Sequence, residues 1–237
     1  REYLEQMKEE LEEEKRRYES LQQEELLFRL VQDLKTFMAR EKEIRARTAE
    51  IQESRERNGR LTRPEKSALR KLGGSQEELA GDVELRLEAV REEGSIAFAS
   101  VMEETAIDMR QIAQLLEARE TGLMVLSLED EVIERIDDLI GGFEDEIERR
   151  REEGGGGGGG GGQQGPPPLV PPIVEIKLIR RMQQDLNRKI ENFWRRNPSV
   201  REGRIDERQR RTLERLYHQQ GRLSRILKEL KQAIYGN

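Results

Sequence analysis

Apolar residues recur every three or four positions through most of this chain, which is the spacing of amphipathic α-helices. No proline or glycine interrupts residues 1–57, so we predict a single long helix there. The first part of this helix has coiled-coil spacing with one polar gap at Glu14, and the second part has a broader face suited to a bundle. The two stripes comprise Leu4, Met7, Leu11, Tyr18 and Leu21, and then Leu27, Leu30, Leu34, Phe37 and Met38.

Turn and capping signals divide the next hundred residues into three more helices, predicted at about 62–93, 95–120 and 124–151. Thr62 and Glu65 have the spacing of a capping box, and Ser95 stands where it can cap the third helix. The pair Gly73-Gly74 either interrupts the second helix or bends it.

Residues 154–172 cannot form a helix or bury apolar surface, because nine glycines are followed by a proline-rich stretch. We therefore predict a disordered linker there. Beyond it, residues 173–237 show two further apolar stripes separated by a turn near Asn197-Pro198, which predicts a helical hairpin. A shift of 144 positions superposes Thr62 and Glu65 on Asp206 and Gln209 together with their following stripes, so we favour a duplicated hairpin.

Composition supports an all-α protein, built of long coiled-coil helices and helical hairpins joined by the linker. Charged residues make up 39% of the chain and aromatic residues only 4%, which suits long amphipathic helices better than a thick globular core. The net charge of −6 is unevenly distributed: residues 169–237 hold 17 Lys/Arg against 8 Asp/Glu, and the remainder holds 26 against 41. These parts are expected to meet each other or to bind different partners.

No residue pattern indicates catalysis, so we predict that the protein is not an enzyme and uses no cofactor. Cysteine is absent and His218 is the single histidine, which leaves too few ligands for a typical zinc site. The glycine run lacks the Lys-Ser/Thr pair of a phosphate-binding loop. We instead expect helix contacts to carry the function, with a core or docking face formed by Leu178, Met182, Leu186, Phe193, Leu213, Leu216 and Leu223.

Arginines cluster around the predicted C-terminal turn, next to Trp194. Arginine beside an aromatic residue is a common way to hold phosphate and base. The same residues also suit a solvated turn or contacts with acidic helices, and we favour that interpretation. The candidate anion contacts are Arg195, Arg196, Arg204, Arg208 and Arg211.

Two stretches resemble uncharacterised helical proteins of planctomycetes and related bacteria. One runs from Met102 to Phe143 and contains LEDEVIERIDDLI; the other is VEIKLIRRMQQDLNRKI at Val174–Ile190, followed by a helix with Gln219-Gln220. The second departs from the usual pattern at Ile190, where threonine is common. Such proteins often accompany biopolymer-transport (ExbB/ExbD-like) systems, and the resemblance implies an accessory role in the cell envelope.

We therefore predict a non-enzymatic scaffold or adaptor whose partners are proteins, either transport-complex subunits or further copies of itself. The alternative is a nucleic-acid-associated coiled-coil protein that binds through the arginine-rich turn, and a third hypothesis is a dimer or filament built on residues 1–57. The chain has no apolar run long enough to span a membrane. It begins with Arg1, which fits a removed signal or anchor or a fragment. The periplasm or envelope is the favoured location, with the cytoplasm as the alternative.

Overall fold

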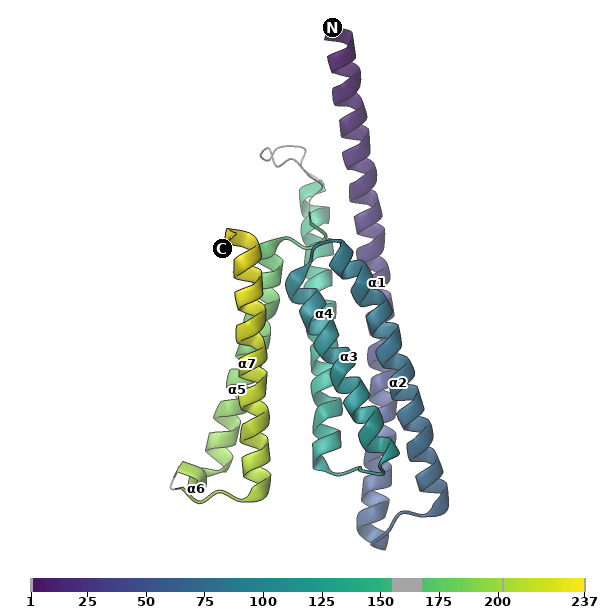
Figure 1. The fold of residues 1–237 in the computed structure, drawn as a ribbon, viewed down its shortest axis with the longest axis vertical. Coiled ribbons are helices and arrows are strands. Elements are labelled where there is room, and N and C mark those ends of the chain that lie inside the picture. Colours follow the sequence, from purple (N-terminus) through teal and green to yellow (C-terminus); the bar gives the residue numbers. More distant parts are fainter. Residues whose placement is uncertain (1, 155–167, 202, 237) are drawn as a thin grey trace.

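The computed structural model describes residues 2–154, 168–201 and 203–236, without the side chains of residues 2, 153, 201 and 208. The regular elements in these ranges are all helices, which confirms the all-α prediction (Figure 1). They are α1 (Glu2–Asn58), α2 (Arg63–Glu92), α3 (Ile96–Glu117), α4 (Leu123–Gly154), α5 (Pro172–Arg196), the single turn α6 (Pro198–Arg201) and α7 (Glu207–Tyr235).

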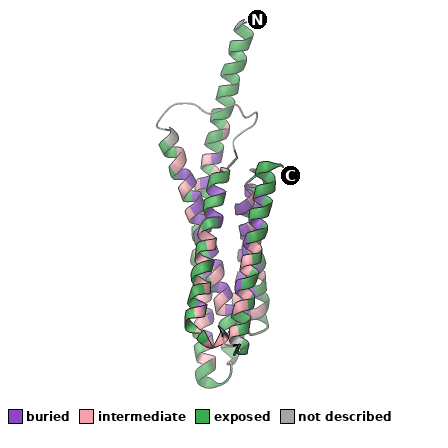
Figure 2. Cartoon of the chain, turned by 90° about the vertical axis from the view of Figure 1, so that its left-hand side faces the viewer, coloured by how far each residue is buried: buried purple, intermediate pink, exposed green. Residues whose placement is uncertain are grey.

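The first four helices form an up-and-down bundle. Helix α1 packs on α2 and α4, and α3 packs on the same two helices from the other side (Figure 1). Phe98, near the start of α3, and Phe143 on α4 are fully buried in its apolar core, and their rings pack in a tilted arrangement with centroids 4.4 Å apart. Because α1 is much longer than the others, its N-terminal residues project beyond the bundle (Figures 1 and 2). We call residues 3–22 of α1 the arm.

Helices α5 and α7, here called the C-terminal pair, lie antiparallel to each other against α3 and α4 (Figure 1). Near residue 170 the pair contributes to the bundle core through Leu178, Ile179, Ile226 and Leu230. Towards its turn it has a small apolar cluster of its own, centred on Leu186, Phe193, Leu216 and Leu223. The pair therefore shares a core with the bundle at one end and packs mainly on itself at the other.

The last residues of the predicted linker are part of the core, which corrects the expectation that residues 154–172 bury no apolar surface. Leu169 and Val170 are fully buried in the main core. The Leu169 N–H donates to the carbonyl of Glu93 (3.4 Å), and Arg150 donates to the carbonyl of Leu169 (2.8 Å). Gly154 still belongs to α4, and residues 155–167 of the predicted linker lie outside the described residues.

Both predicted capping boxes are present, and they begin α2 and α7. The Thr62 hydroxyl accepts from the Glu65 N–H while the Glu65 carboxylate accepts from the Thr62 N–H, and Asp206 and Gln209 make the same reciprocal pair. Each box satisfies two backbone donors that a helix start leaves unpaired.

Helix α2 runs without a break through Gly73-Gly74. A Cβ atom at Gly73 would lie 2.9 Å from Glu117 Cγ and 3.1 Å from the Ala113 carbonyl oxygen, so the glycine lets α2 and α3 approach closely. Gly73 thus serves packing within a continuous helix, whereas a Cβ atom at Gly74 would meet nothing within 4 Å.

Candidate interaction site

The predicted apolar docking face points into the molecule. Leu178 lies in the bundle core, and Leu186, Phe193, Leu216 and Leu223 are buried together between the helices of the C-terminal pair. Met182 and Leu213 are half-buried and pack against that cluster. These residues hold the pair together and attach it to the bundle, so in this structure they offer little surface to an outside protein.

The predicted anion contacts lie around the turn between α5 and α7. Arg195, Arg196, Arg204 and Arg211 are exposed, and the side chain of Arg208 is outside the described residues. Arg211 pairs with Glu207 through Nε and Oε1 at 3.0 Å. Trp194 is half-buried and packs edge-on against Phe193, with ring centroids 5.4 Å apart. The aromatic partner expected for a nucleic-acid site is thus engaged by the apolar cluster.

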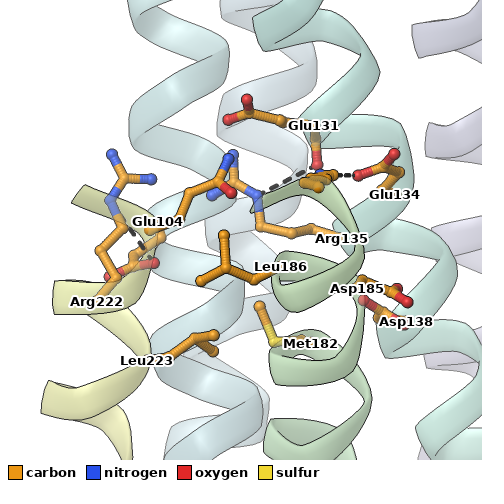
Figure 3. A pocket seen from close by; sticks show the side chains of 12 residues that line it. Glu104, Glu131, Glu134, Arg135, Asp138, Met182, Asp185, Leu186, Arg222 and Leu223 are labelled. Atoms are coloured by element: carbon orange, nitrogen blue, oxygen red, sulfur yellow. Dashed lines mark hydrogen bonds and ion pairs between the residues drawn. The ribbon is translucent and has the colours of Figure 1, made fainter. Parts of the chain in front are cut away.

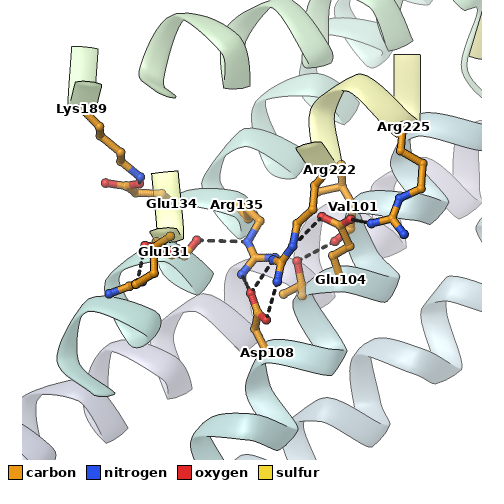
Figure 4. Close-up of polar contacts among 11 residues, drawn as sticks. Val101, Glu104, Asp108, Glu131, Glu134, Arg135, Lys189, Arg222 and Arg225 are labelled. Carbon is orange, nitrogen blue, oxygen red and sulfur yellow. Dashed lines mark hydrogen bonds and ion pairs between the residues drawn. The ribbon is translucent and has the colours of Figure 1, made fainter. Parts of the chain in front are cut away.

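The centre of the seam between bundle and C-terminal pair is a buried carboxylate, Asp108 on α3. It accepts from Arg135 on α4 and from Arg222 on α7, whose Nη1 lies 2.9 Å from Oδ2 (Figure 4). Asp108 is only 1% exposed. Burial alone would raise its pKa, but the two guanidinium groups outweigh that effect and hold the pKa below its ordinary value. Asp108 thus joins three helices from both parts of the molecule.

Further ion pairs repeat the same polarity along the seam, with acidic residues on the bundle and basic residues on the C-terminal pair. Glu104 accepts from Arg225 at 3.0 Å and lies 4.0 Å from Arg222 (Figure 4). The remaining pairs are Glu131 with Arg215, Glu134 with Lys189, and Asp145 with Arg181. Five basic residues of the C-terminal pair are thus paired with carboxylates of the same chain.

A small cavity of about 60 Å³ lies in this seam, between Asp138 on α4 and Asp185 on α5 at one edge and Leu186 and Leu223 at another (Figure 3). Burial and the neighbouring Asp185 raise the pKa of Asp138 to about 7. The space suits about two water molecules and is well below the size of ordinary ligand pockets. Among the described residues, no group of acidic or histidine side chains is arranged to hold a metal ion.

Two more carboxyl groups are enclosed inside the bundle. Glu41 accepts from the Gln76 amide at 2.7 Å, and Glu129 accepts from the Thr48 hydroxyl at 2.8 Å. Burial raises their pKa values to about 8 and about 7. Raised carboxyl pKa values are common in acid–base catalysis. Here both side chains are sealed off, since each is 0% exposed.

Glu175 on α5 performs the capping role that the sequence assigns to Ser95. Ser95 occupies the N-cap position of α3, but its side chain makes no capping hydrogen bond and its buried hydroxyl has no partner. Instead, the buried Glu175 carboxylate accepts from the Ala97 N–H at 3.1 Å. Burial raises the pKa of Glu175 to about 7, and the backbone hydrogen bonds at Ile96 and Ala97 oppose that rise.

The roles of Asp108, Arg135 and Glu175 could not be predicted from the sequence, because each side chain forms its hydrogen bonds with a helix that is distant in the chain. One local signal exists for the enclosed carboxyls, since Glu41 continues the three-four spacing of the apolar stripe on α1 and is therefore predicted to face inward.

A wider groove of about 970 Å³ separates the α3–α4 turn from the first half of α7. Its apolar side carries the exposed Leu123 and Met124, and its charged side includes Arg211 and Glu214, with His218 also in the lining. Charges of both signs line this groove, so it favours neither an anion nor a cation.

The arm carries the most prominent exposed apolar stripe. Every described side chain from Tyr3 to Tyr18 is exposed (Figure 2). Six large apolar side chains in the arm are 51–72% exposed, whereas the other exposed large apolar residues are spread over α2, α3, α4, α5 and α7. These six are Tyr3, Leu4, Met7, Leu11, Tyr18 and Leu21.

Compared with protein families, with curated proteins and with solved structures, the chain gives no significant match. Within the described ranges, no helix has both the length and the apolar character needed to cross a membrane.

Proposed function

We propose that the protein is a non-enzymatic helical adaptor that binds other proteins through its arm. The observation that carries this proposal is the exposed apolar stripe on the arm. Isolated surface leucines are ordinary, but a contiguous stripe at helical spacing is typical of an interface. Helical partners recognise such stripes through a coiled coil or a groove.

The remainder of the molecule supports a structural role. The carboxyl groups with raised pKa values are enclosed by packed helices, and the seam cavity of about 60 Å³ is too small for most substrates. Nucleic-acid binding through the arginine-rich turn has less support, because Trp194 packs on Phe193 in the apolar cluster and Arg211 pairs with Glu207.

The resemblance to helical proteins that accompany biopolymer-transport systems suggests a setting for the adaptor. On that basis, subunits of an envelope transport complex are the first partners to test besides the chain itself. The comparisons with known proteins add nothing to this assignment.

Site-specific photo-crosslinking in the native cells tests the proposal. A benzophenone amino acid replaces Leu11, which lies in the stripe, or Glu9, which lies on the opposite face of the same helix. We expect a covalent adduct with another polypeptide at position 11 and a much weaker one at position 9. The mass of the adduct shows whether the partner is a second copy or a different protein. No adduct at position 11, or equal adducts at both positions, would contradict the adaptor.

A further inference from the structure

We propose that the arm pairs with the arm of a second copy of this chain in a parallel, in-register, two-stranded coiled coil. This inference rests on the proposed function, since it requires protein contacts through the arm, and it adds the identity and orientation of the partner. It draws on the position of the stripe around α1 and on the charges beside it.

The apolar stripe changes face where the arm enters the bundle. Below the arm, the buried residues of α1 keep three-four spacing, as at Leu27, Leu30 and Leu34. At about 100° per residue, the mean direction of the arm stripe differs from that of the bundle stripe by roughly 150°. The arm stripe therefore does not continue the bundle core beyond the end of α4. It faces away from the bundle.

The surface of α1 directly below the arm stripe is polar and solvated. It contains Glu25, Arg29 and Gln32, all exposed, and Glu25 pairs with Arg29 at 2.8 Å. The stripe thus ends near Leu21, and a partner helix on the arm does not meet the bundle below. Two copies joined through their arms would have their bundles on opposite outer sides, without overlap.

The charges flanking the stripe select a second copy in parallel orientation. With Leu4, Leu11 and Tyr18 at heptad position a, Lys8 and Lys15 fall at e and Glu10 falls at g. In a parallel pair, position g faces position e of the next heptad on the partner, so Glu10 faces the second copy's Lys15 on both sides. An antiparallel pair centred on the stripe would bring Lys8 against the second copy's Lys15, which is repulsive, and Glu10 against its Arg17, which is attractive. The flanking charges of the antiparallel pair therefore cancel, whereas those of the parallel pair attract.

One of the a and d positions along the arm stripe is occupied by a charged residue, Glu14 at position d. In a parallel pair, this side chain enters a hole that is partly lined by the second copy's Lys15, which is the one favourable neighbour for a carboxylate there. The two Glu14 carboxylates also approach each other, and this repulsion weakens the dimer. A charged group at a single a or d position of a coiled coil fixes the register while lowering the affinity.

The helix needed for pairing is already formed in the monomer. An isolated segment of this length is marginally helical in water, but the arm is the continuous extension of a helix that the bundle stabilises. Association therefore requires no new helix nucleation.

The first measurement is analytical ultracentrifugation of the full chain over a range of concentrations. We expect a reversible monomer–dimer equilibrium that Leu11→Asp abolishes, with the melting temperature of the bundle unchanged because Leu11 lies outside it. Glu14→Leu should tighten the dimer by at least about tenfold, since it replaces a charge with an apolar side chain in both copies. The matched control Glu13→Leu makes the same change on the arm but away from its apolar stripe, and it should leave the dissociation constant unaltered.

The second measurement fixes the orientation and uses the absence of native cysteine. With Met7→Cys, a parallel pair places the two thiols at facing d positions, where a disulfide forms readily on mild oxidation. A centred antiparallel pair would separate the two positions by about 16 Å along the axis, which is too far for a disulfide. Rapid dimeric crosslinking in the Met7→Cys chain is expected.

The outcomes separate this inference from the function on which it rests. A chain that stays monomeric at all concentrations, both as wild type and with Glu14→Leu, would overturn the dimer. If photo-crosslinking at position 11 then captured a different protein, the adaptor would stand and only the identity of its partner would change. A dimer that Leu11→Asp does not disrupt, or that fails to crosslink through position 7, would equally contradict the parallel coiled coil.

Discussion

The interior of the four-helix bundle and the Asp108 site in the seam that joins it to the C-terminal pair deal with charge in opposite ways. Inside the bundle, Glu41 and Glu129 are fully buried and each accepts a hydrogen bond, and among the described residues neither forms an ion pair. In the seam, Asp108 is matched by arginines from two other helices, whereas burial raises the pKa of Glu104 in spite of its pairing with Arg225. A buried carboxyl thus becomes easier to protonate in the first region and stays ionised at Asp108 in the second.

This difference shows what each region depends on. The bundle is stabilised by burial of apolar surface, and its enclosed carboxyls weaken it whenever they ionise. A buried ion pair contributes little net stability compared with an apolar contact, but it specifies which surfaces meet, because an unmatched charge in the seam is very unfavourable. The seam charges therefore determine where and in which register the C-terminal pair docks.

Removal of Asp108 should have the largest effect. Asp108→Ala leaves the guanidinium of Arg135 buried without its carboxylate, and such a loss typically costs about 3–5 kcal/mol. Chemical denaturation should show this decrease in the free energy of unfolding. Glu103→Ala is the control, since Glu103 is about half exposed and pairs with Arg91 at the surface at 3.0 Å, where loss of an ion pair costs at most about 1 kcal/mol. Equal effects of the two substitutions would contradict the central role of Asp108.

The comparison also shows which parts of the structure were accessible from the sequence. Periodicity and caps predict helices because both depend on residues three or four apart, and the boxes at Thr62 and Asp206 begin α2 and α7 as expected. The partners of Asp108, in contrast, lie 27 and 114 positions away. Local patterns cannot specify such contacts, because they depend on which helix faces pack together.

Local patterns also failed to predict the contacts of Leu169, Val170 and the start of α3. Leu169 and Val170 stand among prolines and look like spacer residues, yet they reach a gap in the core that only the assembled helices create. Ser95 has the right residue type and position for a cap, but the acceptor is supplied by Glu175, which lies 78 positions beyond the Ala97 N–H that it caps. The apolar stripe of the arm, in contrast, could be predicted from the sequence, because its spacing is local.

The pH dependence of stability tests whether the enclosed Glu41 destabilises the bundle when it ionises. Its pKa is about 8 in the folded protein and 4.5 ordinarily, so between these values the folded state binds a proton that the unfolded state has lost. Stability therefore falls as pH rises, by about 1.4 kcal/mol per unit for this group. Glu41→Gln removes that loss and keeps the acceptor for Gln76. It should stabilise the protein by about 3 kcal/mol at pH 7 and by little at pH 4.5.

Thermal or chemical denaturation of wild type and Glu41→Gln from pH 4.5 to 8 measures this difference. Glu129, Asp138 and Glu175 give the wild type a slope of the same sign, so the informative quantity is the gap between the two proteins at each pH. Glu43→Gln, on the exposed face two residues away, is the matched control and should leave the gap near zero. A gap that does not widen with pH would mean that Glu41 is not the enclosed acid that the structure shows.

The smallest predicted effect concerns Glu175. This carboxyl group of the C-terminal pair accepts a hydrogen bond from the first turn of α3 and is not paired with an arginine or lysine in the described residues. Glu175→Ala removes the acceptor of the Ala97 N–H and should cost about 1–2 kcal/mol, as loss of a helix cap does. Ser95→Ala provides the contrast. If Ser95 capped α3, its replacement would cost a similar amount, but its hydroxyl is buried without a partner, so the substitution should be neutral or slightly stabilising. Denaturation of the two variants at pH 5, where the raised pKa of Glu175 takes little stability from the wild type, would decide between them: a loss confined to Ser95→Ala would return the cap to α3 itself and remove this link between the bundle and the C-terminal pair.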